Sequence, residues 1–138
     1  MCAATHGAAI FAPELRAAGG VPYPIECAGD LHTSVIEHLL RGGVDGVLVL
    51  ACPSRDCSHR EGARWLEERV YHGREAELQT RVTRARVRIA NINGGDCVHA
   101  VEVLRTFAAD LKALDRPQVD DDVELGAECA VASAERVT

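Results

Sequence analysis

The chain has 138 residues, 47% of them apolar, and a formal net charge of −6 at neutral pH. This size suits one compact domain of the α/β or α+β class, since single domains commonly have about 100–150 residues. The acidic balance argues against nucleic acid as the main partner. No apolar run approaches the roughly 20 residues of a membrane span, and no signal peptide is evident. We therefore expect a cytoplasmic protein.

The first 27 residues carry weak structural signals. Residues 5–18 allow a short helix, although Pro13 is a potential breaker within it. Residues 21–27, "VPYPIEC", are expected to be extended, because a proline disfavours helix at the residue before it. This extended segment ends in Cys27.

A helix followed by a strand is expected between residues 28 and 52. Asp30 can cap the helix and Gly42 can end it. The strand is "VDGVLVLAC" (44–52), a nearly continuous apolar run of the kind found in parallel sheets that are covered on both faces. The apolar side chains that repeat at helical spacing before it are Leu31, Val35, Leu39 and Leu40.

Residues 61–85 have a long helical pattern with a break at Gly73, and the alternating stretch "RVRIANI" (86–92) predicts a second strand. A final amphipathic helix is expected over residues 94–114, where Cys97 is interpreted as a packing cysteine. Trp65 is expected to be the largest core anchor of the first of these two helices. The full predicted apolar stripes are Trp65, Leu66, Val70, Leu78 and Val82, and then Val98, Val101, Val103, Leu104, Phe107 and Leu111.

Strands that alternate with helices predict a small, doubly wound (Rossmann/flavodoxin-like) parallel sheet with flanking helices. We assign residues 1–114 to this single α/β domain and residues 115–138 to an acidic C-terminal tail exposed to solvent. In such sheets ligands bind at the carboxyl ends of the strands. Cys27 and Cys52 both follow expected strands, so we expect their thiols at one edge of the sheet.

Four cysteines can be gathered at this edge: Cys2, Cys27, Cys52 and Cys57. Four thiolates can hold either a zinc ion or an iron–sulfur cluster. The four residues between Cys52 and Cys57 form a loop long enough to reach around a cluster, whereas structural zinc sites more often have two. Spacing alone leaves both metals open, together with a redox disulfide between Cys52 and Cys57.

The stretch "YPIECAGDLHTSVIEHLLRGGVDGVLVLACPSRDCSHREGARWLEERV" resembles the iron–sulfur delta subunit family of methyl-viologen-reducing hydrogenases. The matching pieces are "CAGDL" from Cys27, "GVDGVLVLAC" ending at Cys52, and "PSRDCSHREG" containing Cys57 and His59. The resemblance covers about residues 22–71 and extends more loosely to the last helix. The family usually opens with an apolar strand that runs into a cysteine-rich element, whereas here Met1 directly precedes Cys2.

This resemblance implies a 2Fe–2S cluster with Cys27, Cys52 and Cys57 as metal ligands. We assign Cys2 as the fourth ligand, because it is the one cysteine left where the family has its cysteine-rich element. If Cys2 is not a ligand, His59 or a residue from outside the chain would complete the site. Otherwise His59 is expected either to donate a hydrogen bond to a cluster sulfur or to satisfy a loop carbonyl. No catalytic residues are expected, because the chain shows no nucleophile–base motif.

The resemblance further implies a non-catalytic electron-transfer subunit of a larger anaerobic oxidoreductase complex. Such a complex would be of the hydrogenase/heterodisulfide reductase or aromatic acyl-CoA reductase kind. The expected partners are flavin- and iron–sulfur-containing subunits similar to heterodisulfide reductase A, met through an apolar surface around the cysteines. The alternative is a structural adaptor subunit whose cysteine site holds zinc or nothing.

Overall fold

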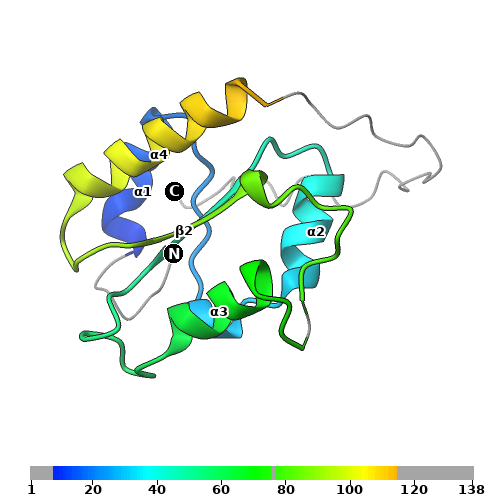
Figure 1. The fold of residues 1–138 in the computed structure, drawn as a ribbon. Coiled ribbons are helices and arrows are strands. Elements are labelled where there is room, and N and C mark those ends of the chain that lie inside the picture. Colours follow the sequence, from blue (N-terminus) through cyan, green and yellow to red (C-terminus); the bar gives the residue numbers. More distant parts are fainter. Residues whose placement is uncertain (1–7, 76, 115–138) are drawn as a thin grey trace, which may run out of the picture.

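The computed structural model describes residues 8–75 and 77–114, which form three layers. A parallel sheet lies between one pair of helices, α1 and α4, and a second pair, α2 and α3 (Figure 1). In chain order the elements are α1 (Ala8–Ala17), η2 (Ala28–Asp30), α2 (Thr33–Arg41), β1 (Val47–Ala51), α3 (Gly62–Tyr71), η3 (Arg84–Arg86), β2 (Val87–Asn91) and α4 (Cys97–Lys112).

The sheet pairs β1 with β2 in parallel, in register from Val47 opposite Val87 to Ala51 opposite Asn91. Successive side chains of a strand point to opposite faces. Val49 and Ala51 therefore pack toward α2 and α3, while Leu50 packs toward α1 and α4. Burial on both faces explains why the sequence of β1 is apolar without alternation.

The predicted doubly wound sheet is confirmed only as a mixed fold with helices on both faces of a parallel sheet. In the described part of the chain the sheet has two strands. Residues 21–27 were expected to add an extended neighbour, but only Ile25 makes a bridge there. The prolines in this segment remove backbone donors that a longer ladder would need.

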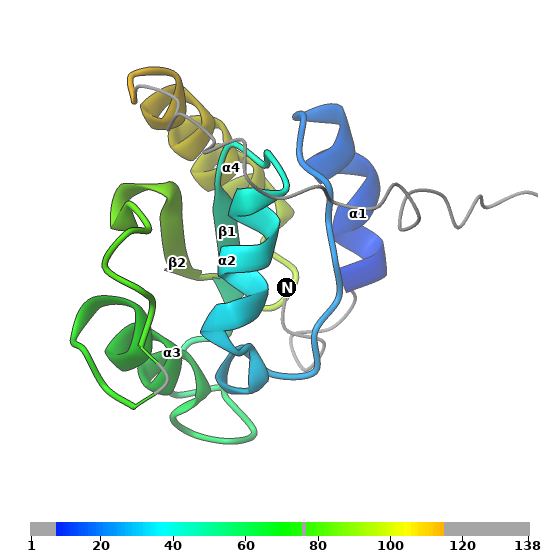
Figure 2. The ribbon, with the colours of Figure 1, turned by 90° about the vertical axis from the view of Figure 1, so that its right-hand side faces the viewer.

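Two hydrophobic cores lie on opposite faces of the sheet. The larger core joins Ile36 of α2 to Leu66 and Val70 of α3, all completely buried. The smaller core packs Phe11 and Leu15 of α1 against residues of β1 and α4, and Figure 2 shows α1 beside α4. The larger core is aliphatic throughout, and the smaller core contains one aromatic residue, Phe11. This agrees with the low aromatic content of the sequence.

Several expectations for buried or capping residues are wrong. Trp65 is 39% exposed, because its neighbour Leu66 occupies the core position and Arg74 lies over the indole ring at 3.7 Å. Val98 is 81% exposed, because the first turns of α4 face the core with Ala100, which is fully buried, and with Cys97 and Val101, which pack against it. Asp30 ends η2 instead of capping α2.

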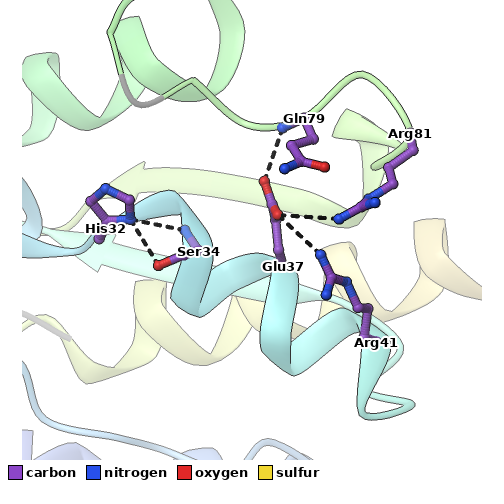
Figure 3. Close-up of polar contacts among 6 residues, drawn as sticks. All are labelled: His32, Ser34, Glu37, Arg41, Gln79 and Arg81. Carbon is purple, nitrogen blue, oxygen red and sulfur yellow. Dashed lines mark hydrogen bonds and ion pairs between the residues drawn. The ribbon is translucent and has the colours of Figure 1, made fainter. Parts of the chain in front are cut away.

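The cap of α2 is His32, whose Nδ1 accepts the backbone N–H of Ser34 at 3.2 Å (Figure 3). Within α2, Ile36 takes the core position, and Val35 and Leu39 of the predicted stripe are 45% and 40% exposed. Gly42 ends the helix as predicted.

The helix predicted to resume after Gly73 is absent from the described residues of that segment. Gly73 has φ +67°, a left-handed conformation that ends α3. The chain beyond it is fixed by side chains instead: Leu78 is fully buried, and the carboxylate of Glu37 accepts the Gln79 N–H at 3.0 Å. Glu37 also faces Arg41 and Arg81 at 3.5 and 3.9 Å (Figure 3).

Within the described ranges, no helix combines the length and the apolar character needed to cross a bilayer. Cys2 and the acidic tail from residue 115 lie outside the described residues. The predicted role of Cys2 and the predicted boundary at residue 114 therefore stay predictions.

Candidate metal centre

Three predicted ligands lie where β1 and η2 meet the start of α3. Cys52 directly follows β1, Cys57 lies in the loop that leads to α3, and Cys27 caps η2, which packs against both α3 and β1. All three are buried, with 3%, 2% and 8% exposure for Cys27, Cys52 and Cys57. Burial of three thiols near one sheet edge agrees with the expectation from the strand ends.

Cys52 and Cys57 form a small buried cluster of their own, separate from the two hydrophobic cores. Their side chains are hydrogen-bonded to each other. Both are free thiols. The loop of four residues between them thus folds back and brings the second sulfur against the first.

The loop backbone surrounds the sulfur of Cys57 with N–H groups. His59, Arg60 and Gly62 each hydrogen-bond to this thiol through the backbone. Arg60 has φ 60°, the left-handed conformation that turns the chain back, and its N–H bonds the Cys57 carbonyl at 3.0 Å. Successive N–H groups in such a turn form a concave site for an anion, and a thiolate is an anion.

These contacts change the acidity of Cys57. Burial raises the pKa of its thiol, while hydrogen bonds from the Gly62 backbone, the Cys52 side chain and the backbone of His59 and Arg60 lower it. The hydrogen bonds outweigh burial, so the pKa of Cys57 lies below its ordinary value. A thiolate, the form that binds metals, is favoured there.

Cys27 meets the same site through two glycines. Its sulfur accepts the Gly29 N–H at 3.4 Å, and a Cβ atom on Gly62 would lie only 2.5 Å from it. A Cβ atom on Gly29 would lie 2.9 Å from the Cα atom of Gly62. Only glycine at both positions lets η2 approach the start of α3 so closely. Gly62 therefore contacts Cys27 on one side and donates to Cys57 on the other.

The donor set suits a metal that prefers sulfur. Thiolates with backbone N–H donors are the usual environment of iron–sulfur clusters and of zinc–thiolate sites. In residues 8–75 and 77–114, however, no three Cys, His, Asp or Glu side chains are arranged as a ready metal-binding group. The described cysteines supply a close pair and a third thiol across Gly62, and a fourth ligand would come from elsewhere.

The other expected site residues have different surroundings. His59 is exposed and reaches Cys57 through its backbone N–H. Cys97 packs beside the smaller core, as interpreted from the sequence. The rim of the cysteine loop is polar, contrary to the expected apolar surface, because Ser54, Arg55, Ser58, His59 and Arg60 are all exposed.

The fold and the site together define a small α/β domain that buries three cysteines near one edge of a parallel sheet. The family profile of the methyl-viologen-reducing hydrogenase, delta subunit, matches residues 20–115, which include both strands and Cys27, Cys52 and Cys57. The chain belongs to this family of hydrogenase delta subunits. Among curated proteins, none matches the chain.

Proposed function

We propose that this chain is the electron-transfer subunit of a hydrogenase-like oxidoreductase complex and carries a 2Fe–2S cluster. Cys27, Cys52 and Cys57 would be three of its ligands, with Cys2 as the fourth. The observation that carries the proposal is the burial of these three thiols: Cys27 and Cys57 both contact Gly62, Cys52 contacts Cys57, and backbone N–H groups are directed at two of the sulfurs. Family membership supports a place in a multi-subunit complex.

When bound, such a cluster accepts and returns single electrons. The residues of this chain would hold its iron atoms and tune their potential. The N–H groups of Gly29, His59, Arg60 and Gly62 stabilise negative charge on sulfur, which favours the reduced state. Burial of the cysteines keeps water from the metal–sulfur bonds. The expected neighbours are flavin- and iron–sulfur-containing subunits similar to heterodisulfide reductase A, within a cytoplasmic, anaerobic complex.

The proposal is tested with the full chain purified without oxygen, as wild type, as Cys57→Ser and as Cys97→Ser. Wild-type protein is expected to be brown and to contain iron and acid-labile sulfide in equal amounts. Cys57→Ser should lose most of both, because serine replaces a ligand. Cys97→Ser is the matched control and should keep them, since Cys97 packs beside the smaller core. Iron content that is the same in both variants would contradict the assignment of Cys57.

The alternative is a structural adaptor with a zinc-bound or empty site, and one observation favours its empty form. The described residues hold no preformed group of three metal-binding side chains. Under this alternative the same preparation would be colourless, with zinc or no metal and without labile sulfide. The contact between Cys52 and Cys57 also permits a disulfide, which mass spectrometry without reductant would detect as a loss of two hydrogen masses.

A further inference from the structure

Arg69 connects α3 to the segment that carries Cys27. Its side chain is half-buried, and one terminal nitrogen of the guanidinium donates a hydrogen bond to the carbonyl oxygen of Gly29, 40 residues away in the chain. The Nε atom donates to the Trp65 carbonyl at 3.2 Å. The bond to Trp65 holds the guanidinium against its own helix. The bond to Gly29 therefore holds η2 at a fixed distance from α3.

The backbone of Gly29 is held at both of its polar groups. Its carbonyl accepts from Arg69, and its N–H donates to the Cys27 sulfur at 3.4 Å. Gly29 also packs against the Cα atom of Gly62, which limits movement of its peptide toward α3. A glycine has wide conformational freedom, so without these contacts the Gly29 peptide could rotate its N–H away from the sulfur.

We propose that Arg69 is a positioning residue of the cysteine site, which fixes the Gly29 carbonyl and thereby keeps the Gly29 N–H directed at the Cys27 sulfur. The inference rests on the proposed function for its effect on a cluster, although the arrangement of Gly29 can be tested without one. With a cluster bound, a lost N–H···S hydrogen bond lowers the reduction potential. Loss of a nearby positive charge acts in the same direction.

The side chain of Arg69 can be tested separately from its backbone. The Arg69 carbonyl accepts the Leu78 N–H at 3.0 Å, a bond that any side-chain substitution leaves in place. Arg69→Met keeps the apolar stem and removes the donors, whereas Arg69→Lys keeps a cation and a donor. The matched control is Arg64→Met on the same helix, because Arg64 is 67% exposed and pairs only with Glu61 and Glu68 in the described contacts.

The first experiment is hydrogen–deuterium exchange of residues 27–31 in the full, metal-free chain. Arg69→Met is expected to speed this exchange about tenfold, the change for one lost hydrogen bond to a charged donor. Arg69→Lys should restore part of the protection, and Arg64→Met should exchange as the wild type does. Wild-type protection in Arg69→Met would overturn the proposal whatever metal the protein holds.

The second experiment is a redox titration of the iron-loaded full chain, in which electron paramagnetic resonance measures the reduced fraction at each potential. Arg69→Met is expected to shift the midpoint potential downward at unchanged iron content, with Arg69→Lys between Arg69→Met and the wild type. An unchanged potential would overturn the tuning role of Arg69. If the wild-type chain holds no iron, the proposed function fails, and the exchange experiment alone decides whether Arg69 orders Gly29.

Discussion

Gly62→Ala is the substitution that tests the geometry of the cysteine site most sharply. The new Cβ atom would lie 2.5 Å from the Cys27 sulfur and 3.2 Å from the Gly29 nitrogen. Ordinary contacts between such atoms are about 3.5–4.0 Å, so the sulfur and η2 must move away by about 1 Å. Overpacking of this kind costs about 1–3 kcal/mol. A small gain in helix propensity offsets part of it.

We therefore expect Gly62→Ala to lower the free energy of unfolding by about 1–2 kcal/mol. In a domain of this size that corresponds to a melting temperature lower by roughly 5–15 °C. The assay is thermal unfolding of the full, metal-free, reduced chain by circular dichroism. Gly42→Ala is the control, since Gly42 has φ −69° and its Cβ would meet nothing closer than 3.3 Å. Equal melting temperatures for Gly62→Ala and the wild type would refute the close approach of η2 to α3.

The remaining predictions concern the core, the Glu37 contacts and Cys97. Leu66→Ala should lower the free energy of unfolding in urea by about 2–5 kcal/mol, because Leu66 is fully buried. Val98→Ala is the control: Val98 is 81% exposed, so its loss should change this free energy by less than about 0.5 kcal/mol. Glu37→Ala removes a buried hydrogen-bond acceptor and should cost about 1–2 kcal/mol; a neutral result in the same assay would mean that this carboxylate does not hold the segment after α3. Burial, then the negative charges of Glu14 and Asp96, raise the pKa of the Cys97 thiol, so less thiolate forms at a given pH. Its alkylation by iodoacetamide should need a higher pH than that of a free cysteine, and Glu14→Gln should shift the pH profile downward; a profile unmoved by Glu14→Gln would contradict the electrostatic cause.

Much of the fold could be predicted because it depends on local patterns. The apolar run before Cys52 predicts β1, since a strand buried on both faces excludes polar residues. The same reasoning fails for Trp65 and Val98. Both fit the apolar spacing of a helix in the sequence, yet both are exposed in the structure. A nearby side chain, Leu66 for Trp65 and Ala100 for Val98, takes the core position, and the apolar pattern alone does not reveal which residue is buried.

The cysteines of the candidate site could be predicted from the sequence, whereas the residues that position them could not. Cys27 and Cys52 follow apolar segments, and their burial near one sheet edge agrees with that pattern. The contacts of Gly29 and Arg69 join segments 40 residues apart, so no spacing rule could indicate them. The position of Gly62 between two cysteines depends on how η2 packs against the start of α3, which no local pattern indicates.

The central claim is that Cys27, Cys52 and Cys57 share one inorganic centre. X-ray absorption at the iron and zinc edges of the full chain, purified without oxygen, tests it most directly. We expect an iron signal with sulfur neighbours only and a second iron nearby. Zinc in place of iron, or iron bound to nitrogen and oxygen, would contradict it.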